Sequence, residues 1–273
     1  MSQKKHHMQT KAQSMLNRFV QAKRQEIADL EQAYAHEGPP SLCAQRSPAL
    51  SSALFQAGPG AVIAEYKPAS PSRGPIALDL SPEQAGELFV QGGSAAISVL
   101  TDSTFFGSNL KALSALVGTG LPLLRKDFII HPIQVTQTAA TPASAFLLIT
   151  RLFARDKKGM HAVYQAGVAA GLEPVVEVFD REDVAAAKDL GAAVILVNSR
   201  DLDTLKLDLD LHQRLIKDKE AGELWICASG LSQRVQIMKM AELGYLACLI
   251  GTSIMDSPDR LAALRSLTGG PNL

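Results

Sequence analysis

An acid and a base close together at the end of an apolar stretch are the side chains of this sequence best suited to chemistry. Residues 61–66 form an apolar run typical of a buried strand, and Glu65 and Lys67, two positions apart, would point to the same face of that strand. The loop that follows is rich in proline, serine and glycine and contains Ser70. This arrangement indicates a site for an anionic substrate. A salt pair facing solvent at the strand end is the alternative interpretation.

Eight apolar runs follow one another along the chain, and they are hydrophobic almost without interruption, as strands buried on both faces must be. They span residues 61–66, 94–100, 121–125, 143–149, 173–178, 192–198, 224–228 and 245–250. Helical segments lie between them, and several of these end in glycine directly before the next run. Eight strand–helix units in roughly 210 residues predict an α/β fold of the (β/α)8 TIM-barrel type. A doubly wound open sheet is the alternative, but no G-x-G-x-x-G motif follows the first run.

The first 60 residues differ from the rest of the chain. Apolar side chains at helical spacing predict an amphipathic helix over residues 9–37, and residues 38–60 are rich in glycine, proline and serine, which is typical of a linker. We therefore expect an N-terminal extension, residues 1–60, whose helix packs on the barrel. Residues 61–273 should form the barrel itself, of the phosphate-binding type.

The overall composition of the chain argues against some classes of binding partner. The 273 residues include 27 basic and 27 acidic side chains, and a net charge of zero argues against a general nucleic-acid or membrane-surface binder. No apolar run reaches the roughly 20 residues that span a bilayer. The cysteines, Cys43, Cys227 and Cys248, lack metal-ligand spacing, and two of them lie in apolar runs, which favours core packing in a reducing cytosol. We expect a cytoplasmic monomer that binds a small molecule, with no metal and no cofactor.

If the chain folds as a barrel, its polar functional residues should lie directly after the predicted strands, because active sites of this fold lie at the carboxyl ends of the strands. Six of the eight predicted strands end in polar residues or glycine. These residues are Glu65, Lys67, Arg125, Lys126, Asp127, Glu177, Asn198, Ser199, Arg200, Ser229, Gly230, Gly251, Thr252 and Ser253. Their convergence on one mouth is hard to explain by solubility, and it predicts a binding site there.

The last two strand ends have the composition of a phosphate site. Gly230 follows the seventh run, and Gly251 and Thr252 follow the eighth. Barrels often hold a phosphate with backbone N–H groups of these two loops and the start of a short helix, and glycine lets the backbone approach the anion closely. Ser70 could add a hydroxyl from the first loop. Ordinary turn glycines are the alternative.

Two lysines, Lys67 and Lys126, face the same predicted mouth. A lysine in a partly desolvated barrel can act as a general acid, can neutralise a carboxylate, or can form a Schiff base as in aldolases. Glu65 and Glu177 would keep both lysines protonated, which favours the acid and anion-binding roles. For Lys126 the alternative is a surface salt bridge with Asp127, which the apolar neighbours weaken.

Aromatic side chains lie in the same loops. Phe105 and Phe106 follow the second run, and Phe128 follows the third. They could line an apolar slot for an aromatic ring, with core packing as the alternative.

With these residues in place, the chain resembles the indole-3-glycerol phosphate synthase family. The resemblance covers nearly the whole chain, including the N-terminal helix, which in that family lies over the top of the barrel. It rests on VIAEYKPASPSRG at 62–74, GGSAAISVLTDSTFFGS at 92–108, LLRKDFII at 123–130, VVEV at 175–178, VNSRDL at 197–202, ASGL at 228–231 and LIGTSIM at 249–255.

The resemblance implies a carbon–carbon lyase of tryptophan biosynthesis that closes an indole ring, with loss of carbon dioxide and water. Its substrate would be 1-(2-carboxyphenylamino)-1-deoxyribulose 5-phosphate, and no metal or cofactor is implied. Lys126 would protonate the ketone oxygen, and Lys67 would lie near the substrate carboxylate. Glu65 and Glu177 would orient the lysines and serve as base, and Asn198 would hold a sugar hydroxyl. Substrate contacts are expected from Ser229, Phe106, Phe128, Leu147 and Arg200, and phosphate contacts from Ser70, Gly230, Gly251 and Thr252.

This chain departs from the family pattern at three places. Ala228 stands where the family usually has a glutamate, residues 142–144 are Pro-Ala-Ser where it has Gly-Ala-Asp, and His131 replaces an acidic residue. The Ala228 change removes a carboxylate from the mouth. It leaves two alternatives open: a divergent paralogue acting on a modified anthranilate adduct, or a barrel that binds phosphosugars without turning them over.

Overall fold

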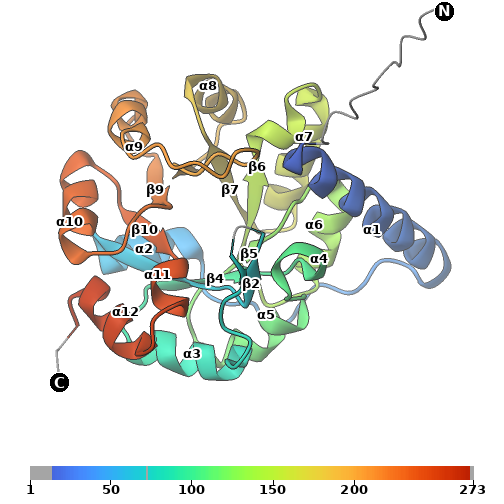
Figure 1. Cartoon of the computed structure of the whole chain (residues 1–273). Coiled ribbons are helices and arrows are strands. Elements are labelled where there is room, and N and C mark those ends of the chain that lie inside the picture. The colour runs from blue at the N-terminus through green and yellow to red at the C-terminus, as the bar shows by residue number, and fades with distance from the viewer. Residues whose placement is uncertain (1–13, 72, 271–273) are drawn as a thin grey trace, which may run out of the picture.

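The computed structural model describes residues 14–71 and 73–270 and confirms a closed (β/α)8 barrel (Figure 1). Eight parallel strands pair in the cyclic order β1, β10, β9, β8, β7, β6, β5, β4. They are β1 (Ala61–Tyr66), β4 (Ala96–Leu100), β5 (Leu123–Lys126), β6 (Ala145–Ile149), β7 (Glu173–Val178), β8 (Val194–Asn198), β9 (Leu224–Ala228) and β10 (Ala247–Ile250). Each lies within, or within two residues of, an apolar run of the sequence. A two-stranded hairpin, β2 (Ala69–Ser70) and β3 (Gly74–Pro75), stands in the loop after β1.

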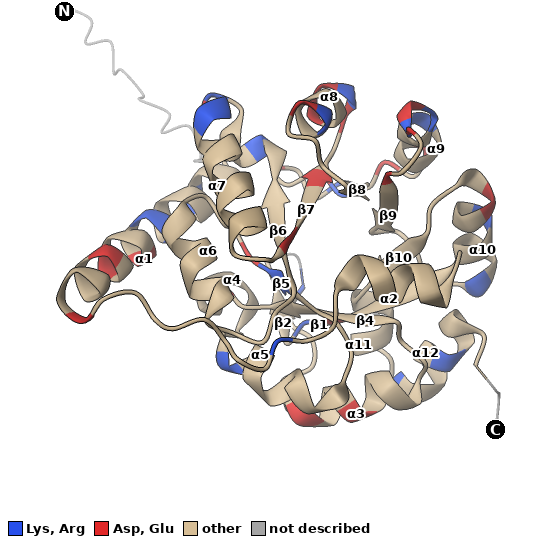
Figure 2. Ribbon diagram, turned by 180° about the vertical axis from the view of Figure 1, so that it is seen from behind, with Lys and Arg blue, Asp and Glu red and all other residues tan. Residues whose placement is uncertain are grey.

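Helices surround the barrel. The outer ones are α3 (Pro82–Gln91), α5 (Lys111–Leu116), α6 (Pro132–Ala139), α7 (Lys157–Ala169), α8 (Arg181–Asp189), α9 (Leu211–Leu215), α10 (Arg234–Leu243) and α12 (Arg260–Thr268), and two shorter ones are α4 (Ser103–Phe106) and α11 (Thr252–Met255). Local signals set their ends: α3 starts with a capping box between Ser81 and Gln84 and has Pro82 in its first turn. Acidic and basic residues both occur on the outer helices (Figure 2).

Side chains of each strand alternate between two apolar layers. In β1, Val62, Ala64 and Tyr66 pack between the strands and the helices, whereas Ala61 and Ile63 pack inside the barrel. Because this alternation has a period of two, Glu65 follows Ile63 into the barrel interior. The local geometry of the strand therefore directs a carboxylate toward the barrel axis.

Two helices precede the barrel. The helix α1 (Met15–Glu37) begins after Ser14, whose side chain accepts a hydrogen bond from the Asn17 N–H, and it lies against the α6 side of the barrel (Figure 1). Residues 9–13 of the predicted helix lie outside the described residues. The helix α2 (Leu50–Ala57) buries Leu50 and Leu54 in the same apolar cluster as the barrel interior.

The described residues contain neither a membrane-spanning helix nor a metal-binding cluster. No helix within residues 14–71 and 73–270 combines the length and the apolar character needed to cross a membrane. In the same part of the chain, no three histidine, cysteine, aspartate or glutamate side chains are grouped so that they could hold a metal ion.

Candidate active site

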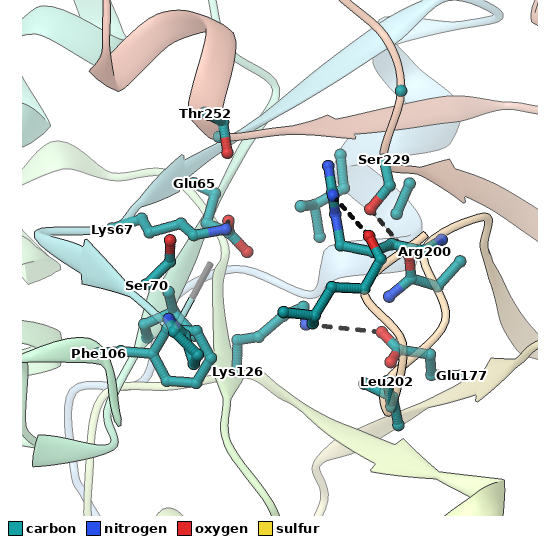
Figure 3. A pocket seen from close by; sticks show the side chains of 18 of the residues that line it. Glu65, Lys67, Ser70, Phe106, Lys126, Glu177, Arg200, Leu202, Ser229 and Thr252 are labelled. Carbon is teal, nitrogen blue, oxygen red and sulfur yellow. Dashed lines mark hydrogen bonds and ion pairs between the residues drawn. The ribbon is translucent and has the colours of Figure 1, made fainter. Parts of the chain in front are cut away.

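A cavity of about 490 Å³ opens where the strands end, and all eight strands contribute to its wall (Figure 3). One residue from each strand illustrates this: Glu65, Leu100, Lys126, Ile149, Glu177, Asn198, Ala228 and Ile250. The loops after β1, β8, β9 and β10 add further lining residues. The site therefore lies at the carboxyl mouth of the barrel, as this fold predicts.

Two lysine–glutamate pairs stand in the cavity. Lys67 Nζ lies 3.5 Å from Glu65 Oε2, and Lys126 Nζ lies 3.5 Å from Glu177 Oε2. Glu177 is fully buried, and among the described residues neither of its carboxylate oxygens accepts a hydrogen bond, so Lys126 compensates its charge. Burial by itself lowers the pKa of Lys126, but Glu177 and Glu65 outweigh that effect and raise the pKa above its usual value. Lys126 is thus held as an ammonium, ready to donate a proton.

The structure separates Lys126 from the two charged residues beside it. Arg125 and Asp127 point away from the cavity, since neighbouring side chains of a strand alternate. Arg125 Nη1 donates to the Gln134 carbonyl at 3.1 Å, and its Nη2 lies 2.8 Å from Asp127 Oδ2. The surface salt bridge between Lys126 and Asp127 is therefore not formed.

Of the polar strand ends expected to converge on the mouth, Arg125, Asp127 and Ser199 do not line the cavity. The Ser199 hydroxyl donates to the Ser229 carbonyl at 3.1 Å and so joins the ends of β8 and β9. The other eleven do line it: Glu65, Lys67, Lys126, Glu177, Asn198, Arg200, Ser229, Gly230, Gly251, Thr252 and Ser253.

Ser229 and Arg200 lie opposite Lys67 in the cavity (Figure 3), and hydrogen bonds to Asn198 join them into a polar wall. Ser229 Oγ donates to Asn198 Oδ1 at 2.8 Å, and the same oxygen accepts from the Arg200 N–H at 3.0 Å. Arg200 Nη1 donates to the Leu205 carbonyl at 3.1 Å, and within the described residues it has no carboxylate partner. Burial, followed by the charge of Arg73, lowers the pKa of Arg200. The Arg200 guanidinium lines the cavity beside a second cation, Arg73, and is therefore suited to binding an anion.

The predicted phosphate residues come together on the β9 and β10 side of the mouth. Ser229 and Gly230 both have left-handed backbones, with φ of 71° and 78°, a conformation that is unusual for serine and often found at functional sites. Gly251 precedes α11, and the first N–H groups of a helix have no intrahelical partner. Ser70 is buried and lines the same cavity, as does Thr252.

An aromatic wall forms part of the cavity and includes a residue that the sequence did not single out. Phe106 and Phe128 line the cavity as predicted, and Phe19 from α1 lines it with them. The Phe19 and Phe128 rings stack with centroids 4.0 Å apart, and Phe105 packs edge-on against Phe19 at 4.7 Å. Phe19 was visible in the sequence only as one residue of an amphipathic helix.

Leu147 is placed differently from the prediction. It is fully buried in the barrel interior and does not line the cavity, whereas Ile149 does. Both residues point inward from β6, but Ile149 lies two positions nearer the carboxyl end of the strand. Further lining residues that sequence reasoning missed are Arg73, Leu100, Asp201, Leu202, Leu205, Leu207, Leu231, Leu249 and Ile250.

The departures from the family pattern have separate consequences. His131 caps α6, since its Nδ1 accepts from the Ile133 N–H at 3.3 Å, and the Ser144 hydroxyl lies 3.1 Å from that of Ser47. Neither residue lines the cavity. Ala228 does line it, and its carbonyl lies 3.1 Å from His212 Nε2. Of these changes, Ala228 is the one that alters the site.

A closed (β/α)8 barrel with two lysine–glutamate pairs and a polar wall at its carboxyl mouth has the architecture of a barrel enzyme. A family model described as "Indole-3-glycerol phosphate synthase" matches residues 10–267. Proteins named indole-3-glycerol phosphate synthase from Desulfosudis oleivorans and Aquifex aeolicus are 38% and 37% identical to this chain, over 78% and 76% of it and 80% and 81% of their own lengths. One from Exiguobacterium sibiricum is 32% identical over 94% of this chain and 97% of its own. The chain belongs to the indole-3-glycerol phosphate synthase family.

Solved structures agree on the fold. The 3-hexulose-6-phosphate synthase of Salmonella typhimurium superposes with a TM-score of 0.60 at 13% identity, covering 77% of this chain and 97% of that one. The N-acetylmannosamine-6-phosphate 2-epimerase of Clostridium perfringens gives 0.56 at 16% identity, covering 74% and 91%.

Proposed function

We propose that this protein converts 1-(2-carboxyphenylamino)-1-deoxyribulose 5-phosphate to indole-3-glycerol phosphate, with loss of carbon dioxide and water. The observation that carries the proposal is the Lys126 ammonium, held in the cavity by Glu177 and Glu65. Ring closure creates a negative oxygen from the ketone, and a positioned ammonium can protonate it as it forms.

The steps follow from the chemistry of the substrate. The ring carbon that carries the carboxylate attacks the ketone carbon, and Lys126 donates its proton to the ketone oxygen. Carbon dioxide then leaves, and the electrons of the broken carbon–carbon bond stay in the ring and restore its aromaticity. The new hydroxyl departs as water when an acid protonates it and a base removes a proton from the adjacent CH2 carbon, which creates the double bond of the indole. The pair of Lys67 and Glu65, with 3.5 Å between Nζ and Oε2, supplies such an acid and base.

The two anionic ends of the substrate fit two parts of the cavity. We assign the phosphate to the loops that contain Gly230 and Gly251, where backbone N–H groups can reach it. We assign the carboxylate to the neighbourhood of Lys67, with Phe106 and Phe128 against the aromatic ring. Asn198 and Ser229, already joined by a 2.8 Å hydrogen bond, are placed for the sugar hydroxyls.

The proposal is tested by incubating the purified protein with this substrate and following indole absorbance and fluorescence. A Schiff-base aldolase is disfavoured, because the raised pKa of Lys126 keeps its nitrogen protonated and poorly nucleophilic. Treatment with borohydride in the presence of substrate distinguishes the two hypotheses, because it traps a Schiff base. A trapped lysine adduct would support the aldolase. Indole product with nothing trapped supports the synthase.

Ala228 supports a second candidate, a paralogue that accepts a modified anthranilate adduct. A small side chain in the cavity wall leaves room that a glutamate would fill. Comparing turnover of the unmodified substrate with that of ring-substituted analogues distinguishes the two.

We further infer that the protein acts in the cytoplasm as a monomer on a small molecule, without a nucleic-acid or membrane partner. The buried sulfurs of Cys227 and Cys248 lie 3.1 Å apart as free thiols, which suits a reducing compartment. Gel filtration of the purified protein tests the oligomeric state.

A further inference from the structure

We propose that Lys23 is a positioning residue for this reaction, whose buried ammonium holds the helix α1 against the barrel and fixes the loops on either side of the aromatic wall. The inference rests on the proposed function, since it concerns where substrate and Lys126 are held. Lys23 itself does not line the cavity.

The attachment of α1 to the barrel depends on few side chains. The helix has 23 residues, yet only Phe19 and Lys23 are buried. Its other apolar side chains, Val20, Ile27 and Leu30 among them, are only half-buried, so burial of apolar surface holds α1 only in part. At its start, the Leu16 N–H donates to Asp203 Oδ1 at 3.0 Å, which ties the helix to the loop after β8. With so few fully buried side chains, α1 depends strongly on its buried ionic interaction with the barrel.

Lys23 makes that interaction. The residue is 2% exposed, and Nζ lies 2.7 Å from Asp127 Oδ1, 2.9 Å from Asp102 Oδ2 and 2.7 Å from Glu26 Oε2. Burial by itself lowers the pKa of Lys23, but Asp127 and Asp102 outweigh that effect and raise the pKa. The ammonium is therefore permanently charged, and it joins α1 to the ends of two neighbouring barrel strands.

Each of the two aspartates also holds a segment of the active site. Asp127 follows Lys126 directly, and its Oδ1 accepts from the Phe128 N–H at 2.8 Å. Asp102 caps α4, since its Oδ1 accepts from the Phe105 N–H at 2.7 Å, and α4 carries the cavity residue Phe106. The carboxylates that bind Lys23 thus fix the backbone on both sides of the aromatic wall.

Phe19 completes the connection. It lies four residues before Lys23, so both side chains project from the same face of α1. Phe19 lines the cavity and stacks on Phe128 at 4.0 Å, and the ion cluster of Lys23, one helical turn away, helps to hold α1 where this stacking forms. Loss of the ammonium would release the aromatic wall, which holds the substrate ring. It would also loosen the segment that carries Lys126, which protonates the substrate.

The test compares Lys23→Met with Arg24→Met. Both variants remove one cation and one tryptic site from α1, but Arg24 is exposed and is not part of the ion cluster. With kinetics measured well below the melting temperature of each variant, we expect Lys23→Met to raise KM about tenfold and to lower kcat about tenfold, because both the ring site and the acid are displaced. Brief trypsin treatment should cleave α1 several-fold faster in Lys23→Met than in the parent. Arg24→Met should stay within about twofold of the parent in KM, kcat and cleavage.

Two further variants keep the result interpretable. Lys23→Arg retains a cation and should recover most of kcat and KM. The double variant Lys23→Met/Asp102→Asn removes one charge of each sign, so it should fold better than Lys23→Met but keep the raised KM, because α1 still lacks its anchor.

Kinetics and cleavage of Lys23→Met or of the double variant that matched those of Arg24→Met, with only the melting temperature lowered, would overturn the proposal and leave Lys23 a stabilising residue. If the parent itself made no indole product, the proposed function would fail, whereas the cleavage rates would still decide whether Lys23 holds α1.

Discussion

Replacing Lys126 by methionine should stop catalysis while leaving substrate binding largely intact. Methionine keeps most of the side-chain bulk but cannot donate a proton. A positioned general acid contributes about a hundredfold to ten-thousandfold, so we expect kcat to fall by that factor, or about 2.7–5.5 kcal/mol of barrier. KM should change only a few-fold, because the phosphate loops and the aromatic wall are untouched.

The same substitution has a second consequence that the structure makes calculable. Glu177 is fully buried, its oxygens accept no hydrogen bond among the described residues, and Lys126 Nζ is 3.5 Å away. Removing one partner of a buried ion pair typically costs about 3–5 kcal/mol, so Lys126→Met should also unfold more easily. The double variant Lys126→Met/Glu177→Gln removes the uncompensated charge. It should regain part of the stability and none of the turnover.

Steady-state indole formation over a range of substrate concentrations, together with urea unfolding followed by circular dichroism, separates the two effects. Turnover of Lys126→Met within a few-fold of the parent would exclude Lys126 from the mechanism. Turnover that returned in the double variant would show that the loss reflected folding and not proton donation.

Three further predictions concern other parts of the site. A β-carbon at Gly251 would lie 2.4 Å from Glu65 Oε2, so Gly251→Val should displace the start of α11. We expect competitive inhibition by inorganic phosphate to weaken about tenfold or more, with an unchanged circular dichroism spectrum. Unchanged inhibition would place the anion elsewhere. Ala228→Glu returns a carboxylate to the mouth and should favour the ammonium forms of Lys67 and Lys126. We therefore expect a higher turnover and a basic limb of the pH–rate profile that moves to higher pH. A turnover below that of the parent would contradict this prediction. Burial alone would raise the pKa of Asp127, but Arg125 and Lys23 outweigh it and hold the pKa below its ordinary value of about 3.9. The stability that Asp127 contributes is therefore complete above that value and is lost as the pH falls below it, so Asp127→Asn should flatten the drop in unfolding free energy between about pH 5 and pH 2; an equally steep drop in the variant would refute the assignment.

Much of the barrel and its site could be predicted from local patterns. The eight apolar runs contain or border the eight strands, and polar residues at their carboxyl ends include both lysine–glutamate pairs. The alternation of side chains along β5 could have separated Lys126 from Arg125 and Asp127 as well, since one faces the barrel axis and the other two face away.

Other features required the folded chain. Leu147 and Ile149 share one face of β6, and only the depth of the cavity decides that Ile149 reaches it. Ser229 adopts a left-handed backbone that its residue type does not favour, and in the folded chain its hydroxyl donates to Asn198 Oδ1. Neither feature can be predicted from a local sequence pattern.

The amino-acid order by itself determined the strands, the helices and the residue types at the mouth, because these depend on spacing within one element and on the fixed geometry of a parallel barrel. The role of α1 was decided only by the tertiary structure. Lys23 was one charged residue among many on an amphipathic helix, and Phe19 was one apolar residue among several. The closed barrel brings Asp102, Asp127 and Phe128 together beside α1, and contact with them makes Lys23 an anchor and Phe19 a wall of the active site.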